Sequence, residues 1–137
     1  MTATGNMRWF RAVLILGVLY LVTGLVFAAL AKSAASNQAR AAWRLAAWAI
    51  SAVAFGAHIG YEHVRLRSSS RTTALHASLA VGLGAFGLAV AATLHAQAAQ
   101  KHFPAFALVL WPLLTALPAF VVALAAAAIL TRARQSA

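Results

Sequence analysis

Long apolar runs alternate with short polar links along the whole chain. The apolar runs cover about residues 12–31, 42–61, 72–95 and 105–131. Each is close to the roughly 20 residues that a helix needs to cross the hydrocarbon core of a bilayer. Because backbone polar groups in lipid must be hydrogen-bonded internally, each run predicts a helix. The pattern therefore predicts an all-α integral membrane protein, a four-helix transmembrane bundle with short loops that forms a single domain over residues 1–137.

The composition agrees with this class of protein. Hydrophobic residues make up 64% of the chain and charged residues 9%, whereas soluble domains average about 45–50% and about 25%. The first apolar run also exceeds the roughly 7–15 residues of a signal-peptide core. We therefore expect the first helix to be retained rather than cleaved after Ala31.

The formal net charge of +10 reflects Lys and Arg side chains at the ends of the apolar runs. Cations in these positions anchor helices to lipid headgroups, so we expect a lipid bilayer as partner and no nucleic acid. The predicted termini and second link carry seven of them, against four in the first and third links. By the positive-inside rule this predicts a multi-pass protein of the cell membrane with both termini in the cytoplasm. The seven are Arg8, Arg11, Arg65, Arg67, Arg71, Arg132 and Arg134, and the four are Lys32, Arg40, Arg44 and Lys101.

Small residues at four-residue spacing predict where helices pack closely. The second run has Gly56 and Gly60, and the third has Ser78 and Gly82. Lipid tails supply little hydrophobic drive between helices, so close backbone approach through small side chains carries much of their association. We expect the second and third helices to meet along these four residues.

A polar stripe follows one face of the second predicted helix. Arg44, Ser51, His58 and Arg65 recur every seven residues, and Glu62 lies one turn beyond His58. Polar side chains in a span normally face the bundle or a wet cavity, so the stripe is a candidate lining for a pathway. The alternative is local: the arginines reach the two interfaces, Ser51 bonds its own backbone, and Glu62 pairs with Arg65.

His58 and His76 lie near the ends of two consecutive predicted helices, at one membrane level. One hypothesis is that both hold a haem or a metal ion, with Glu62 orienting the His58 imidazole. In that case arginines of the link would pair with the haem propionates. These arginines are Arg65, Arg67 and Arg71. The alternative is that the histidines bond nearby backbone or headgroups and that no cofactor is held.

Enzyme chemistry has little support in the sequence. The chain has one acidic residue, Glu62, and no cysteine. A carboxylate pair, a Ser-His-Asp triad and a thiolate nucleophile are therefore excluded. We expect a non-enzymatic scaffold or accessory subunit, in a homo-oligomer or a larger membrane complex. The alternatives are a small transporter or channel that uses the polar face of the second helix, and a haem- or metal-binding protein that uses His58 and His76.

Overall fold

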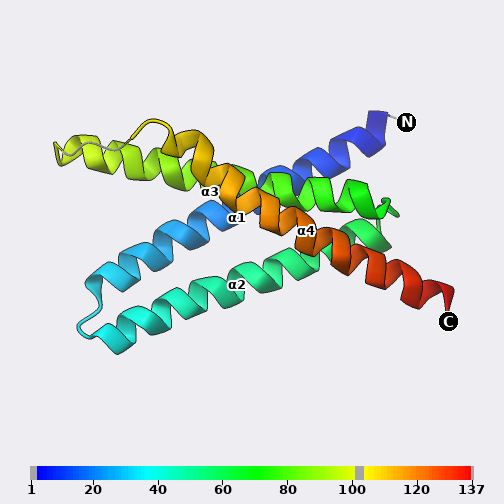
Figure 1. Cartoon of the computed structure of the whole chain (residues 1–137), viewed down its shortest axis with the longest axis horizontal. Coiled ribbons are helices and arrows are strands. Elements are labelled where there is room, and N and C mark those ends of the chain that lie inside the picture. Colours follow the sequence, from blue (N-terminus) through cyan, green and yellow to red (C-terminus); the bar gives the residue numbers. More distant parts are fainter. Residues whose placement is uncertain (1–2, 101–103, 137) are drawn as a thin grey trace.

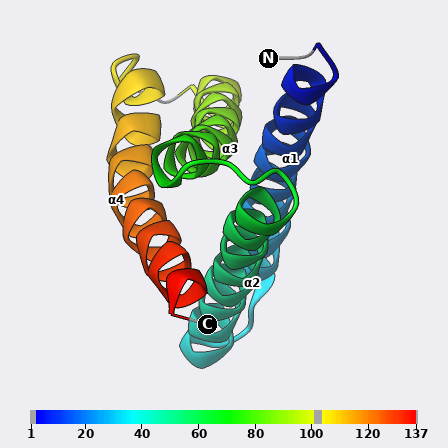
Figure 2. The ribbon, with the colours of Figure 1, turned by 90° about the vertical axis from the view of Figure 1, so that its right-hand side faces the viewer.

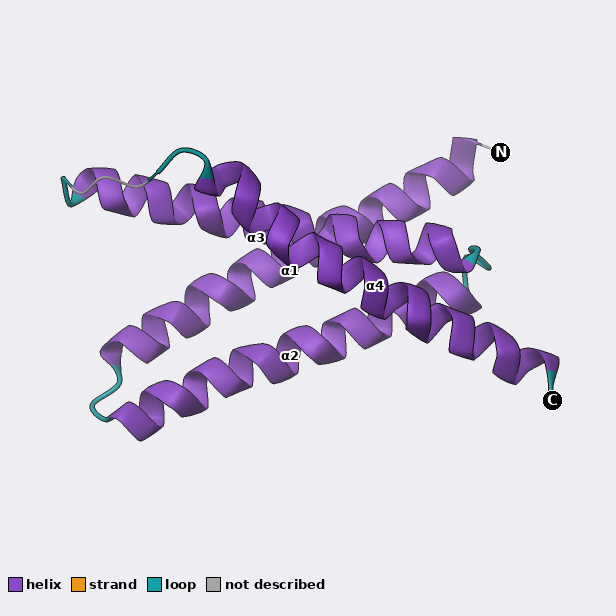
Figure 3. Cartoon of the chain, viewed as in Figure 1, coloured by secondary structure: helices purple, strands orange, loops and turns teal. Residues whose placement is uncertain are grey.

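The computed structural model describes residues 3–100 and 104–136, which form four helices (Figures 1 and 3). Lys101, which entered the charge count, lies outside this part of the chain. The helices extend beyond the predicted apolar runs, except that the last begins two residues later than predicted. They are α1 (Ala3–Ser33), α2 (Asn37–Val64), α3 (Ser70–Ala98) and α4 (Ala107–Gln135).

All four helices are long and apolar enough to cross a membrane, which confirms the predicted helical class. At about 1.5 Å per residue, the 29 residues of α3 rise about 43 Å, more than the roughly 30 Å of a hydrocarbon core. Each helix can therefore reach past the apolar layer at both ends.

Serine caps fix where two of the helices begin. The Ser36 side chain accepts a hydrogen bond from the backbone N–H of Ala39, and the Ser69 side chain accepts one from Thr72. Both serines have extended backbone conformations, as N-cap residues do. Between α2 and α3, Arg67 adopts a φ of 50°, which helps the chain reverse within a few residues.

Helix α3 is the centre of the arrangement. It packs extensively against both α4 and α1, whereas α2 packs mainly along α1 and meets α3 and α4 over much shorter stretches. The end-on view shows α3 between α1 and α4, with α2 beside α1 (Figure 2). Both termini and the α2–α3 link lie at the same end of the molecule (Figure 1).

Glycines allow α1 and α3 to approach closely. A Cβ atom added at Gly84 would lie 2.6 Å from Cβ of Tyr20 and 3.1 Å from the backbone oxygen of Gly17. Likewise, a Cβ at Gly24 would lie 2.7 Å from Leu88. Larger residues at these positions would force the two helices apart, so the α1–α3 interface depends on small residues.

The predicted contact of α2 with α3 along four small residues is wrong. A Cβ at Gly56 or Gly60 would meet no atom within 4 Å, and one at Gly82 would meet Ala116 of α4 at 3.4 Å. Ser78 is buried, but its hydroxyl donates to the Leu75 carbonyl of its own helix. The physical reason is the rotation of α2, which turns its polar stripe inward and its glycines outward.

Candidate functional site

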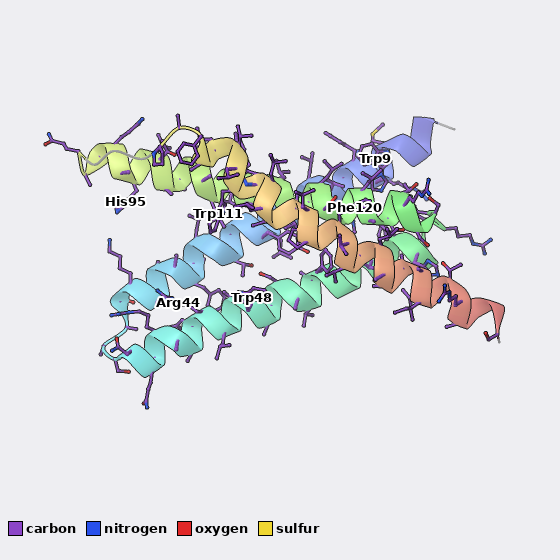
Figure 4. All side chains as sticks on the ribbon, viewed as in Figure 1. Trp9, Arg44, Trp48, His95, Trp111 and Phe120 are labelled. Carbon is purple, nitrogen blue, oxygen red and sulfur yellow. The ribbon has the colours of Figure 1, made fainter. Side chains whose placement is uncertain are left out.

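The acidic side chain of the protein is buried near the end of α2. Glu62 has a relative exposure of 0%, and His58, one turn before it, has 2%. Ser51 on the same face is half-buried. The predicted polar stripe is therefore directed into the bundle over these three residues. Arg44, at the other end of α2, is exposed (Figure 4).

The α2–α3 link and α3 both supply hydrogen bonds to the Glu62 carboxylate. The Ser68 hydroxyl donates to Oε2 at 2.8 Å, and Nδ1 of His76 lies 3.0 Å from Oε1. In the tautomer with its hydrogen on Nδ1, His76 is the donor. The backbone N–H of Ser68 also donates to the Glu62 carbonyl at 3.2 Å. These bonds fold the link back onto the last turn of α2.

His58 approaches the same carboxylate without bonding to it. Its Nε2 atom is 3.7 Å from Glu62 Oε1, beyond hydrogen-bond distance, and neither ring nitrogen has a hydrogen-bond partner. His63 and Thr73, also buried, likewise have unpaired side-chain polar atoms. Burying a polar group without a partner costs about 1–3 kcal/mol. At this end of the α2–α3 contact, therefore, only some of the buried polar side chains are hydrogen-bonded.

Trp9 of α1 completes the cluster. Its ring stacks on the His76 imidazole with the centroids 4.5 Å apart and the planes inclined by 6°. Figure 4 shows Trp9 on the N-terminal half of α1, beside α3. Through Glu62, His76 and Trp9, the cluster thus joins the three consecutive helices α1, α2 and α3. We refer to Trp9, His58, Glu62, Ser68 and His76 as the histidine cluster.

Sequence reasoning placed His58, Glu62 and His76 together but missed Ser68 and Trp9. The serines at 68–70 begin four residues after the last residue of α2, so a hydroxyl within reach of Glu62 was a detectable signal. Trp9 gave no such signal, because its position against α3 depends on how α1 crosses the bundle. The arginines proposed as propionate partners are all exposed. They are Arg65, Arg67 and Arg71.

The arrangement does not fit the hypothesis that His58 and His76 hold a haem. His58 and His76 direct nitrogen atoms toward the same Glu62 oxygen, and Trp9 covers one face of the His76 ring. The glycines nearest His58 in sequence, Gly56 and Gly60, lie on the opposite face of α2 and so make no room for a haem beside the cluster. Among residues 3–100 and 104–136, no group of three or more His, Asp or Glu side chains is arranged to hold a metal ion.

Comparison of the chain with protein-family models, with curated proteins and with solved structures finds no match in any of the three.

Proposed function

We propose that this chain is a non-enzymatic integral membrane protein, a scaffold or accessory subunit that acts by lateral association through one face of α2. The observation that carries the proposal is the open space beside Gly56 and Gly60: apart from their own turn of α2, no atom lies within 4 Å of where a Cβ would stand. We call this surface the outer α2 face. It consists of Leu45, Ala49, Val53, Gly56 and Gly60.

The glycines of α1 and α3 provide the comparison. Gly17, Gly24, Gly84 and Gly87 would each place a Cβ 2.9 Å or closer to a side chain of the opposite helix. Thus these helices use glycine where another helix presses against it. Gly56 and Gly60 are four residues apart on one side of α2 and have no such partner within the described chain, which supports association with another helix.

The rest of the outer α2 face suits contact in a bilayer. Leu45 is 70% exposed and Val53 73%, and both lie on the same side of the helix as the glycines. In lipid, apolar side chains beside a small-residue pair supply the van der Waals contacts that stabilise helix pairs.

The histidine cluster supports a structural role over catalysis. Its carboxylate is completely buried and bonded to Ser68 and His76. A carboxylate that is held in this way fixes helices to one another and has no accessible face for a substrate. A scaffold requires such internal fixation if its outer face is to keep one shape.

Single cysteines test the proposal directly, because the chain has none of its own. We expect Val53→Cys to form a disulfide or bifunctional crosslink in native membranes, and Ile50→Cys not to. Ile50 is also exposed, at 43%, and is at similar depth, but it lies on another side of α2. Adding Gly60→Leu to Val53→Cys should abolish the adduct. Absence of an adduct at Val53 in native membranes would contradict the proposal.

The mass of the adduct identifies the partner. An adduct of twice the mass of the 14.3 kDa chain is expected for a homo-oligomer, whereas another mass is expected for a subunit of a larger complex. Either outcome is consistent with association through the outer α2 face. The mass decides whether the partner is a second copy of the chain or another protein.

A second candidate function is a small transporter or channel that uses the inner face of α2. It is favoured by one observation: Ser51, His58 and Glu62 face the bundle, and the buried His58 nitrogens are unpaired. Ionisable residues within a span often mark ion or proton pathways. Cation or proton flux into liposomes that is lost with Glu62→Gln, but not with Gly56→Ala, would support this function. Absence of flux would leave the scaffold as the better proposal.

A further inference from the structure

A groove of about 320 Å³ lies between the first half of α1 and the end of α2. It is separate from both the histidine cluster and the outer α2 face. Its walls come mainly from one side of α1, with one residue of α2 opposite. The lining residues are Arg8, Arg11, Ala12, Ile15, Leu16 and Tyr61.

Arg8 and Arg11 make one end of the groove strongly positive. They are one helical turn apart and both are exposed. The chain has a single acidic residue, Glu62, and its buried carboxylate is already bonded to Ser68 and His76. No Asp or Glu side chain of this chain therefore neutralises the two guanidinium groups, so an anion must come from outside.

The other end of the groove is apolar. Ala12, Ile15 and Leu16 continue the same side of α1 toward the middle of the helix, and Ile15 is 68% exposed. Tyr61, 44% exposed, forms the opposite wall and combines an aromatic ring with a hydroxyl group. The groove thus changes from charged to apolar along the helix axis, as an amphiphile does from headgroup to tail.

We propose that this groove binds an anionic phospholipid. The phosphate lies between Arg8 and Arg11, where guanidinium groups offer paired hydrogen bonds to its oxygens. One acyl chain lies along Ala12, Ile15 and Leu16. Basic pockets between helices near a membrane surface are a recognised geometry for anionic lipid headgroups. Phospholipid is favoured over free phosphate because the apolar part of the groove gives a soluble anion nothing to contact.

The test is retention of lipid by the purified full-length protein in mild detergent, measured by native mass spectrometry. Phosphatidylglycerol and phosphatidylcholine are offered in equal amounts. We expect selective retention of phosphatidylglycerol, reduced at least tenfold in the double variant Arg8→Gln/Arg11→Gln. The matched control is Arg65→Gln/Arg71→Gln, which removes the same charge from exposed positions at the same end of the molecule. It should retain lipid like the unmodified protein.

Two further measurements separate a lipid site from a general anion site. Ile15→Ser keeps all charges and should lower retention of phosphatidylglycerol several-fold. Millimolar inorganic phosphate should displace little of the bound lipid. Equal losses in both double variants, no preference for phosphatidylglycerol, or complete displacement by inorganic phosphate would each overturn the proposal. Circular dichroism and size-exclusion profiles of the variants establish that each remains folded.

Discussion

Nδ1 of His76 lies 3.0 Å from Oε1 of Glu62, although 14 residues separate the two in sequence. This bond connects the last turns of α2 to the first turns of α3 at the only place where α2 holds a charged side chain completely inside the bundle. Helix α2 otherwise meets α3 over a short stretch. The attachment of α2 to α3 should therefore depend strongly on this pair.

Removal of the Glu62 carboxylate should destabilise the protein. Glu62→Ala leaves Ser68 and His76 without their partner, and an unsatisfied buried polar group costs about 1–3 kcal/mol. Glu62→Gln keeps an oxygen acceptor and should cost less than Glu62→Ala. Unfolding in mixed detergent followed by circular dichroism measures both. Equal stability of Glu62→Ala and the unmodified protein would show that the cluster does not stabilise the contact between α2 and α3.

The stacking of Trp9 on His76 should contribute to the attachment of α1. Aromatic pairs contribute about 0.5–1.5 kcal/mol beyond the burial of their surface. Trp9→Phe keeps a ring over the imidazole, whereas Trp9→Leu keeps apolar volume without a ring. We expect Trp9→Leu to be the less stable by about that amount. If the two variants unfold at the same detergent composition, the ring contact is energetically unimportant.

Glycines at two positions should respond in opposite ways to the same substitution. Gly84→Ala places a Cβ 2.6 Å from Tyr20 Cβ and close to the α1 backbone, and overpacking of this kind costs about 1–3 kcal/mol. Gly60→Ala meets no atom within 4 Å. It should be neutral or stabilising by up to about 1 kcal/mol, because alanine is the better helix former. Unfolding of both variants at a high ratio of detergent to protein, which suppresses association between chains, makes the comparison. A larger loss at Gly60 than at Gly84 would place the tight interface on α2 rather than between α1 and α3.

The number and approximate position of the helices were predictable from the sequence, because a bilayer-length apolar run has few alternatives to a helix. Their ends were not, since a helix is ended by its caps rather than by the last apolar residue. Ser36 begins α2 at Asn37, five residues before the predicted start of the apolar run at residue 42. Ser69 similarly begins α3 ahead of residue 72.

Partners of the small residues were harder to predict than the helices. A glycine pair shows that a helix can be approached closely but does not identify the approaching helix. Gly84 meets α1, and Gly60 meets nothing in the described chain. The prediction that His58 and His76 lie at one level was correct, since both approach the same Glu62 oxygen. A short link between antiparallel helices fixes the level of the residues on both sides of it. The rotation of α2 turns Glu62 inward and the glycines outward. It depends on how all four helices pack, so the sequence of α2 alone did not predict it.

The sidedness of the chain in a membrane is the last prediction. Both termini and the α2–α3 link lie at one end of the molecule, and the α1–α2 link lies at the other (Figure 1). Because Lys and Arg are more numerous at the first of these ends, the positive-inside rule places it in the cytoplasm.

Single cysteines at two exposed positions, Ala35→Cys and Ser69→Cys, report the two ends in a chain without other cysteines. In intact cells, a membrane-impermeant maleimide should label Ala35→Cys and leave Ser69→Cys unlabelled until the membrane is permeabilised. The reverse labelling would invert the orientation. Labelling of both positions in intact cells would contradict the assignment of the two links to opposite sides.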